Sequence, residues 1–146
     1  RLKPSDMIVE MTEGILLDTA PMTQAALRGL HEYGVRLAID DFGTGYSSLS
    51  YLRRLPVTEL KLDKRFVDDL AIDASSRALS KAVISIGQSL NLTVIAEGVE
   101  DPGQREILRQ QGFHAGQGYL FARPLSVEAF EDWMAERTHE AKSQLA

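Results

Sequence analysis

Short β-rich apolar segments alternate with segments of helical periodicity along the chain, and this alternation occurs five times. The segments predicted as strands cover residues 7–11, 35–39, 59–63, 93–97 and, with a weaker pattern, 116–120. The predicted helices cover residues 21–33, 48–55, 76–90, 102–111 and 127–137. This alternation predicts a parallel sheet with helical crossovers, which is either an open doubly wound sheet or part of a closed barrel.

Residues that favour helix ends support these boundaries. Pro21 suits the first turn of its helix, and Gly34 suits the position just beyond the end. Pro56 ends the second predicted helix and Gly112 the fourth, while Ser126 suits the N-cap of the last.

The spacing of the predicted strand ends favours the barrel. They recur about every 27 residues between Glu10 and Gln117, so that eight such units need roughly 200 residues or more, close to the usual size of a TIM barrel. The 146 residues suit one compact domain and hold about five βα units. Five units cannot close a barrel by themselves.

Composition limits the chemistry available to the chain. Cys is absent, which excludes disulfides and thiolate ligands and leaves Asp, Glu and three His as ligands for a hard cation. The net charge of -5 argues against a DNA-binding surface but is compatible with a phosphate-bearing ligand held through divalent cations. No apolar run is long enough to span a bilayer and no signal peptide is evident, so we expect a cytoplasmic segment, either free or within a larger membrane-attached protein.

Polar side chains gather at the carboxyl ends of the predicted strands. They are Glu10, Asp40, Asp41, Lys61, Asp63, Glu97 and Gln117. In parallel α/β folds these ends share one rim, which carries the active site, so we expect these side chains to converge. Several carboxylates close together are costly to bury unless divalent cations or Lys61 compensate their charge.

The segment around Asp40 and Asp41 is the sharpest motif. Adjacent side chains point to opposite sides of an extended strand, so two carboxylates that both bind one ligand require the strand to end between them. Gly43 and Gly45 allow that departure. The glycine fingerprint of dinucleotide-binding proteins is not met, and a simple helix-capping turn is the other interpretation of this segment.

Taken one at a time, the other candidates have ordinary interpretations. Glu13 suits a surface or helix-start position, Glu100 a helix entry, and Gln117 a loop amide without a role. Lys61 and Asp63 share one side of their strand and are also compatible with a surface ion pair. Their joint placement on one rim is what favours a functional site.

Histidines and the last helix are expected to have structural or surface roles. His31 and His139 suit exposed positions, whereas His114 lies closer to a strand. The apolar residues Phe130, Trp133 and Met134 of the last predicted helix are expected to pack in the core; they recur at helical spacing.

Several of these segments together resemble the bacterial EAL domain family, whose members are cyclic di-GMP phosphodiesterases. The resemblance extends from about residue 7 to residue 137. The segments that carry it are residues 10–13, 40–49, 60–63, 96–100, 117–120 and 123–125. The stretch from Asp40 to Ser48, Asp-Asp-Phe-Gly-Thr-Gly-Tyr-Ser-Ser, is highly specific for this family.

The resemblance implies a TIM-type (β/α)8 barrel that opens one phosphodiester bond of cyclic di-GMP to give linear pGpG. It implies Mg²⁺ or Mn²⁺ at a two-metal site, which would hold the phosphate and activate water. By position in the motifs, the resemblance implies that Glu10, Asp40 and Asp41 are metal ligands and that Lys61 and Asp63 hold a water. It implies that Glu97 is the general base, that Glu100 and Gln117 line the pocket, and that Glu13 steadies the glycine loop. The loop at residues 42–48 and the helix after it resemble a homodimer contact.

The chain departs from the family pattern in one respect. The Glu-Ala-Leu motif that names the family and a second, Asn-bearing motif both supply metal ligands, and neither is present. We therefore expect residues 1–137 to be the carboxyl-terminal portion of an EAL domain, followed by a polar tail at 138–146. Its partners would be the front of the barrel, roughly 100 residues, and a sensory domain. The chain alone is expected to be inactive or to fold only by association, and a non-catalytic receptor or protein-interaction module is the alternative function.

Overall fold

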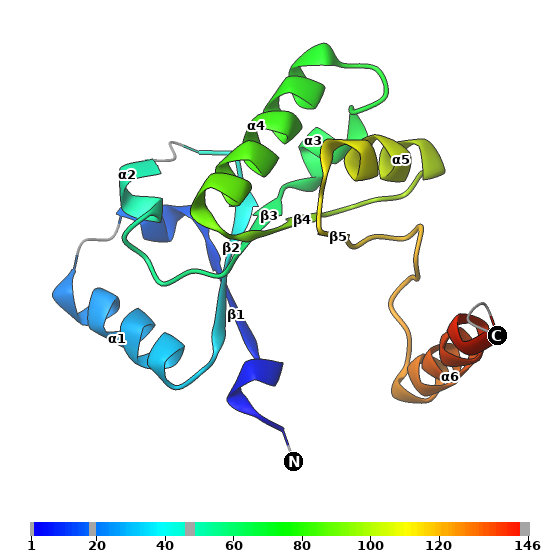
Figure 1. The fold of residues 1–146 in the computed structure, drawn as a ribbon, viewed down its shortest axis with the longest axis horizontal. Helices are drawn as coiled ribbons and strands as arrows, with labels where there is room; N and C mark the ends of the chain where they lie inside the picture. The colour runs from blue at the N-terminus through cyan, green and yellow to red at the C-terminus, as the bar shows by residue number, and fades with distance from the viewer. Residues whose placement is uncertain (1, 18–19, 46–48, 144–146) are drawn as a thin grey trace.

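A computed structural model describes residues 2–17, 20–45 and 49–143 of the chain. Its strands are β1 (Ile8–Thr12), β2 (Arg36–Phe42), β3 (Glu59–Leu62), β4 (Thr93–Ala96) and β5 (Ala115–Gly116). Its helices are α1 (Pro21–Glu32), α2 (Leu49–Leu52), α3 (Lys64–Asp68), α4 (Ala74–Leu90), α5 (Pro102–Gln111) and α6 (Val127–Ser143), with short 3₁₀ helices η1 (Pro4–Asp6) and η2 (Glu13–Leu17) (Figure 1). None of the helices in these described ranges is both long and apolar enough to cross a bilayer.

The strands form one parallel sheet in the order β1-β2-β3-β4-β5. Each strand therefore lies beside the next strand in sequence, whereas a doubly wound sheet reverses its strand order at a switch point. The prediction of an α/β fold with consecutive barrel-type βα units is confirmed.

Caps and a glycine bound α5 and the start of α6 where the sequence predicted, whereas α2 ends at Leu52, before the predicted residue 55. Gly112 closes α5 in a left-handed conformation, with φ 89°. Asp101 caps the start of α5 by accepting hydrogen bonds from the backbone of Gly103 and Gln104. The hydroxyl of Ser126 accepts a hydrogen bond from the backbone N–H of Ala129 at 3.3 Å, as expected for an N-cap of α6.

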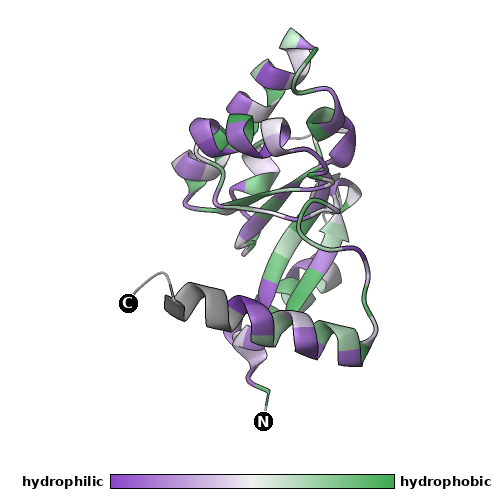
Figure 2. Ribbon diagram, turned by 90° about the vertical axis from the view of Figure 1, so that its right-hand side faces the viewer, coloured by the Kyte–Doolittle hydropathy of each residue, from purple (hydrophilic) through white to green (hydrophobic). Residues whose placement is uncertain are grey.

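The core consists of the strands and the helix faces that pack on them. Fully or almost fully buried side chains include Leu37, Ile39, Leu60, Leu62, Val94 and, from α4, Val83 and Ile84. Figure 2 shows mainly hydrophobic strands beside helices that carry both hydrophilic and hydrophobic residues. Strand β3, most residues of β2 and half of those of β4 are buried, as in strands covered by crossover helices, whereas β1 alternates between exposed and half-buried residues and β5 is exposed.

Three predicted strands are shorter than expected, and one of them, β4, stops at Ala96, one residue before its predicted end. Asp63 does not extend β3; it caps α3, and its carboxylate accepts a hydrogen bond from the Arg65 backbone. The fifth strand has two residues rather than residues 116–120. After it the chain turns at Gly118 and approaches the backbone of Val99 so closely that a Cβ on Gly118 would lie 2.3 Å from Val99 atoms. Side-chain bonding and this close approach override the strand pattern.

Helix α6 also differs from its prediction. Figure 1 shows it apart from the sheet, at the end of an extended segment. Phe130 is 50% exposed and Met134 46%, so the prediction that they pack in the core is wrong. The helix continues to Ser143, beyond the predicted end at Arg137 and into the predicted polar tail. The extended segment carries these apolar side chains away from the sheet they would otherwise cover.

Candidate active site

A buried lysine joins three strands of the rim. The ammonium nitrogen of Lys61, on β3, lies 2.9 Å from Glu10 Oε1 on β1, 3.2 Å from Asp40 Oδ1 on β2 and 2.6 Å from Glu97 Oε1 just after β4. The parallel register places these residues at the same ends of neighbouring strands. The structure thus brings together the polar rim residues that the sequence scattered.

Charge compensation explains how this lysine tolerates burial. Its side chain is only 5% exposed. Burial by itself would lower the pKa of Lys61, but its hydrogen bonds to Glu10, Glu97 and Asp40 outweigh burial and raise it. Lys61 is therefore a fixed positive charge, and the interpretation of Lys61 and Asp63 as a surface ion pair is wrong.

The pair Asp40-Asp41 converges through a bulge. The prediction that the strand ends between them is wrong. Strand β2 continues to Phe42, and its register against β3 shifts between Ile39 and Phe42. Asp41 adopts a left-handed conformation with φ 55°, and its N–H donates to Asp40 Oδ1 at 3.0 Å. Asp is among the few non-glycine residues that tolerate this conformation, and the extra residue of a bulge re-aims a side chain.

Asp63, at the N-cap of α3, is one of the neighbours that shift the pKa of Asp41. Burial, then the charge of Asp40 and a hydrogen bond with Asp63, raise the pKa of Asp41. Burial opposes ionisation of Asp63 as well, but hydrogen bonds from the Arg65 side chain and backbone outweigh it and hold the pKa of Asp63 below its usual range. The pKa values of the two aspartates are thus shifted in opposite directions, because Arg65 directly stabilises the ionised carboxylate of Asp63.

Three carboxylates have the arrangement of a cation site. Ligating oxygens of Asp40, Asp41 and Glu97 all lie within 4.8 Å of one another. This set includes Glu97, for which the resemblance implied the role of general base. It does not include Glu10, although Glu10 contacts Lys61 as Asp40 and Glu97 do. Oxygen-only donors of this kind fit hard divalent cations such as Mg²⁺, Mn²⁺ or Ca²⁺.

Glu97 is held by two donors on one of its oxygens. Lys61 Nζ and Gln117 Nε2 both lie 2.6 Å from Glu97 Oε1. Burial, and then the charges of Asp40 and Glu10, raise the pKa of Glu97, although Lys61 opposes them. Within the described part of the chain no donor bonds Glu97 Oε2. That oxygen is available to accept a proton or bind a cation.

Glu13 is buried, although its sequence position suits a surface residue. Only 7% of it is exposed. Its Oε2 accepts hydrogen bonds from the backbone N–H groups of Gly43 at 3.2 Å and Gly45 at 3.0 Å. Glu13 thereby ties η2 to the glycine loop after the bulge, while Tyr46, Ser47 and Ser48 of the same motif lie outside the described residues.

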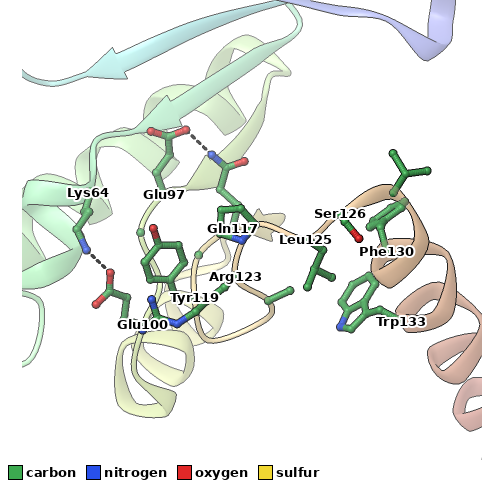
Figure 3. A pocket seen from close by; sticks show the side chains of 15 residues that line it. Lys64, Glu97, Glu100, Gln117, Tyr119, Arg123, Leu125, Ser126, Phe130 and Trp133 are labelled. Atoms are coloured by element: carbon green, nitrogen blue, oxygen red, sulfur yellow. Dashed lines mark hydrogen bonds and ion pairs between the residues drawn. The ribbon is translucent and has the colours of Figure 1, made fainter.

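A pocket of about 760 Å³ adjoins the rim (Figure 3). Glu97 and Gln117 line one end, and Glu100 reaches Lys64 at 2.5 Å across its wall. Arg123 lies 4.6 Å from the centre of the Tyr119 ring. Phe130 and Trp133 of α6 form the far side.

Lys64, Tyr119 and Arg123 also line the pocket, although they are not among the predicted site residues. Lys64 directly follows Asp63, and Arg123 lies in one of the family segments, so proximity to the motifs was the available signal. His114 has a structural place: its Nδ1 accepts a hydrogen bond from the Val94 backbone N–H at 3.0 Å.

Comparison with known proteins agrees with this geometry. A family model described as the EAL domain matches residues 1–124. The chain belongs to the EAL domain family. The expected family membership is thereby confirmed.

Curated EAL relatives are much longer than this chain. It is 45% identical over 127 residues to the bifunctional diguanylate cyclase/cyclic di-GMP phosphodiesterase MucR of Pseudomonas aeruginosa, covering 87% of the chain and 18% of MucR. It is 47% identical over 129 residues to the oxygen sensor protein DosP of Escherichia coli, covering 88% of the chain and 16% of DosP. The chain therefore spans less than one fifth of either protein.

Solved EAL structures share the fold. The MucR phosphodiesterase in complex with c-di-GMP superimposes with a TM-score of 0.83 at 44% identity, over 88% of this chain and 52% of that one. BlrP1 of Klebsiella pneumoniae, in a complex with manganese and c-di-GMP, gives a TM-score of 0.77 at 36% identity, over 84% of this chain and 31% of that one. These neighbours are TIM-barrel EAL domains, so the five βα units belong to a barrel of that type.

Proposed function

We propose that this chain is the carboxyl-terminal part of a metal-dependent phosphodiesterase domain that hydrolyses cyclic di-GMP to linear pGpG. The observation that carries the proposal is the cluster of Asp40, Asp41 and Glu97, two of which, Asp40 and Glu97, also bond the buried cation of Lys61. Relatives with 45% and 46% identity are named cyclic di-GMP phosphodiesterases, and a solved neighbour binds c-di-GMP.

Asp40 and Asp41, together with Glu10, would hold Mg²⁺ or Mn²⁺, and Glu97 lies in the same carboxylate cluster as the two aspartates. Bound divalent ions supply charge neutralisation at the phosphate and activation of a water nucleophile. The bulge directs both aspartates to one rim. Two metal ions would compensate the mutual repulsion of the clustered carboxylates.

Glu97 would act as the general base. Lys61 and Gln117 orient its carboxylate through Oε1, which leaves Oε2 to accept the proton of the attacking water. Its pKa is raised, which brings that pKa nearer to the value of an effective general base. Lys61 and Asp63 would hold the metal-bound or attacking water.

Residues next to the carboxylate cluster would support it. Glu100 and Gln117 would contact substrate or order water in the pocket, and Glu13 would steady the glycine loop through its two hydrogen bonds. A homodimer would form through the loop at residues 42–48 and the helix after it. The whole protein would act in the cytoplasm, with the front of the barrel and a sensory domain as its other parts.

The decisive experiment is an assay of pGpG formation from cyclic di-GMP with Mg²⁺ or Mn²⁺, using the intact protein that contains this sequence. Asp41→Asn keeps the size of the side chain but removes a ligand charge, and we expect at least about 100-fold slower turnover. Asp69→Asn, which changes an exposed aspartate beyond α3, is the matched control.

Two outcomes would contradict the proposal. Binding of cyclic di-GMP without turnover in the folded wild-type protein would instead support a receptor. Turnover that Asp41→Asn leaves unchanged would place the chemistry elsewhere.

A further inference from the structure

Gln104 is a buried polar side chain that the site above does not include. It lies in the first turn of α5, and only 8% of it is exposed. Its Oε1 accepts hydrogen bonds from two consecutive backbone N–H groups, at 2.9 Å from Glu100 and at 3.0 Å from Asp101. A buried acceptor with two backbone donors fixes the path of the chain, because losing it leaves both donors without that partner.

The loop that Gln104 holds is also bonded on its other side. The Val99 N–H donates to the Gln117 carbonyl at 3.0 Å, and the Leu120 N–H donates to the Val99 carbonyl at 3.0 Å. Gly118 permits this approach, since a Cβ there would overlap the Val99 backbone. Residues 97–101 are thus fastened between α5 and the segment 117–120.

The segment 117–120 also contacts Glu97, the proposed general base. Gln117, whose backbone bonds Val99, donates its side-chain amide to Glu97 at 2.6 Å. We propose that Gln104 is a positioning residue, which holds residues 97–101 against the segment 117–120 so that Gln117 and Glu97 keep their contact. Its catalytic consequence rests on the proposed phosphodiesterase function, whereas the structural role does not.

Other contacts of the loop do not substitute for Gln104. Lys64 bonds Glu100, but both side chains are about half exposed, and exposed ion pairs hold geometry weakly. Asp101 accepts hydrogen bonds from Gly103 and Gln104, so it caps α5 but does not hold the backbone N–H of Glu100. Gln104 is the buried acceptor for that group.

The test compares Gln104→Met with Gln104→Glu in the intact protein. Met retains length and volume without an acceptor, whereas Glu keeps an acceptor and is the other residue favoured in a capping box. For Gln104→Met we expect faster amide hydrogen exchange at Val99, Glu100 and Leu120, and Mn²⁺ affinity or kcat lower by roughly 10- to 100-fold with little change in KM. Gln104→Glu should recover most of both losses.

Asp73→Ala provides the control for a general loss of helix capping. Asp73 caps α4 through Ser75 and Ser76, so its removal should lower stability without changing exchange in residues 97–101 or kcat. If Gln104→Met does not fold, Gln104→Asn retains the amide one methylene too short and should speed the same exchange.

The outcomes separate the two proposals. Unchanged exchange at Val99, Glu100 and Leu120 in a folded Gln104→Met protein overturns the positioning role, whatever the protein hydrolyses. If the wild type produces no pGpG while Gln104→Met still loosens the loop and weakens Mn²⁺ binding, the positioning role stands and the phosphodiesterase function fails.

Discussion

The rim of the sheet and helix α6 invert the usual distribution of polar and apolar side chains. At the rim, the charged side chain of Lys61 is 5% exposed among Glu10, Asp40 and Glu97. On α6, Phe130 is half exposed, and it stacks on Trp133 with ring centres 6.0 Å apart. Charged residues are almost never buried unless they are paired, because desolvation of a charge costs free energy. The rim bears this cost, and its ion pairs offset it.

The difference comes from what surrounds each region. Neighbouring strands enclose Lys61 on both sides, because β3 lies inside the sheet. Helix α6 follows a segment that leaves the sheet, so its apolar side chains meet one another and the pocket (Figures 1 and 3). Burial here follows from place in the fold rather than from residue type.

We expect the largest loss of stability from a substitution that removes the charge at the centre of the rim. Lys61→Met leaves the surrounding carboxylates without their shared cation, and we expect about 3 kcal/mol lower stability in urea unfolding of the intact protein. Mn²⁺ should restore part of the loss, since a divalent cation can compensate the same carboxylates. Lys64→Met, at an exposed lysine on the next element, should change little; a similar cost for both variants would contradict the special role of Lys61.

An intermediate effect is expected where the rim loop meets the segment after β5. Gly118→Ala places a Cβ against the Val99 backbone and should cost about 2 kcal/mol in the same unfolding measurement. Gly29→Ala is the matched control, because a Cβ there has open space within α1 and should stabilise by about 0.5 kcal/mol. Equal effects at both glycines would mean that residues 97–100 and 117–120 are not in close contact.

The smallest effect is expected on α6. Phe130→Ala should lower stability by less than about 1 kcal/mol, because half of this side chain is already exposed. Leu62→Ala, in the buried core of β3, should cost about 3 kcal/mol and serves as the reference. A cost for Phe130→Ala that matches Leu62→Ala would show that α6 is packed in the core after all, as its sequence pattern predicted.

Local patterns predicted most of the elements because each depends on nearby residues. The bounds of α5 agree with the prediction, since Pro102 begins it and Gly112 ends it. The bulge at Asp40-Asp41 could not be derived in this way. It arises where two residues of β2 face one position of β3, and that register exists only in the assembled sheet.

The site shows the same division. By itself the sequence determined the parallel α/β fold, the rim on which the polar residues meet and the family, because periodicity, strand ends and motif spacing are properties of the chain. Only the tertiary structure decided that Lys61 bonds three carboxylates, that Glu97 joins Asp40 and Asp41 in the cation cluster, and that Glu13 is buried under the glycine loop. These are contacts between side chains far apart in sequence, and their partners are selected by distance and burial once the strands have aligned.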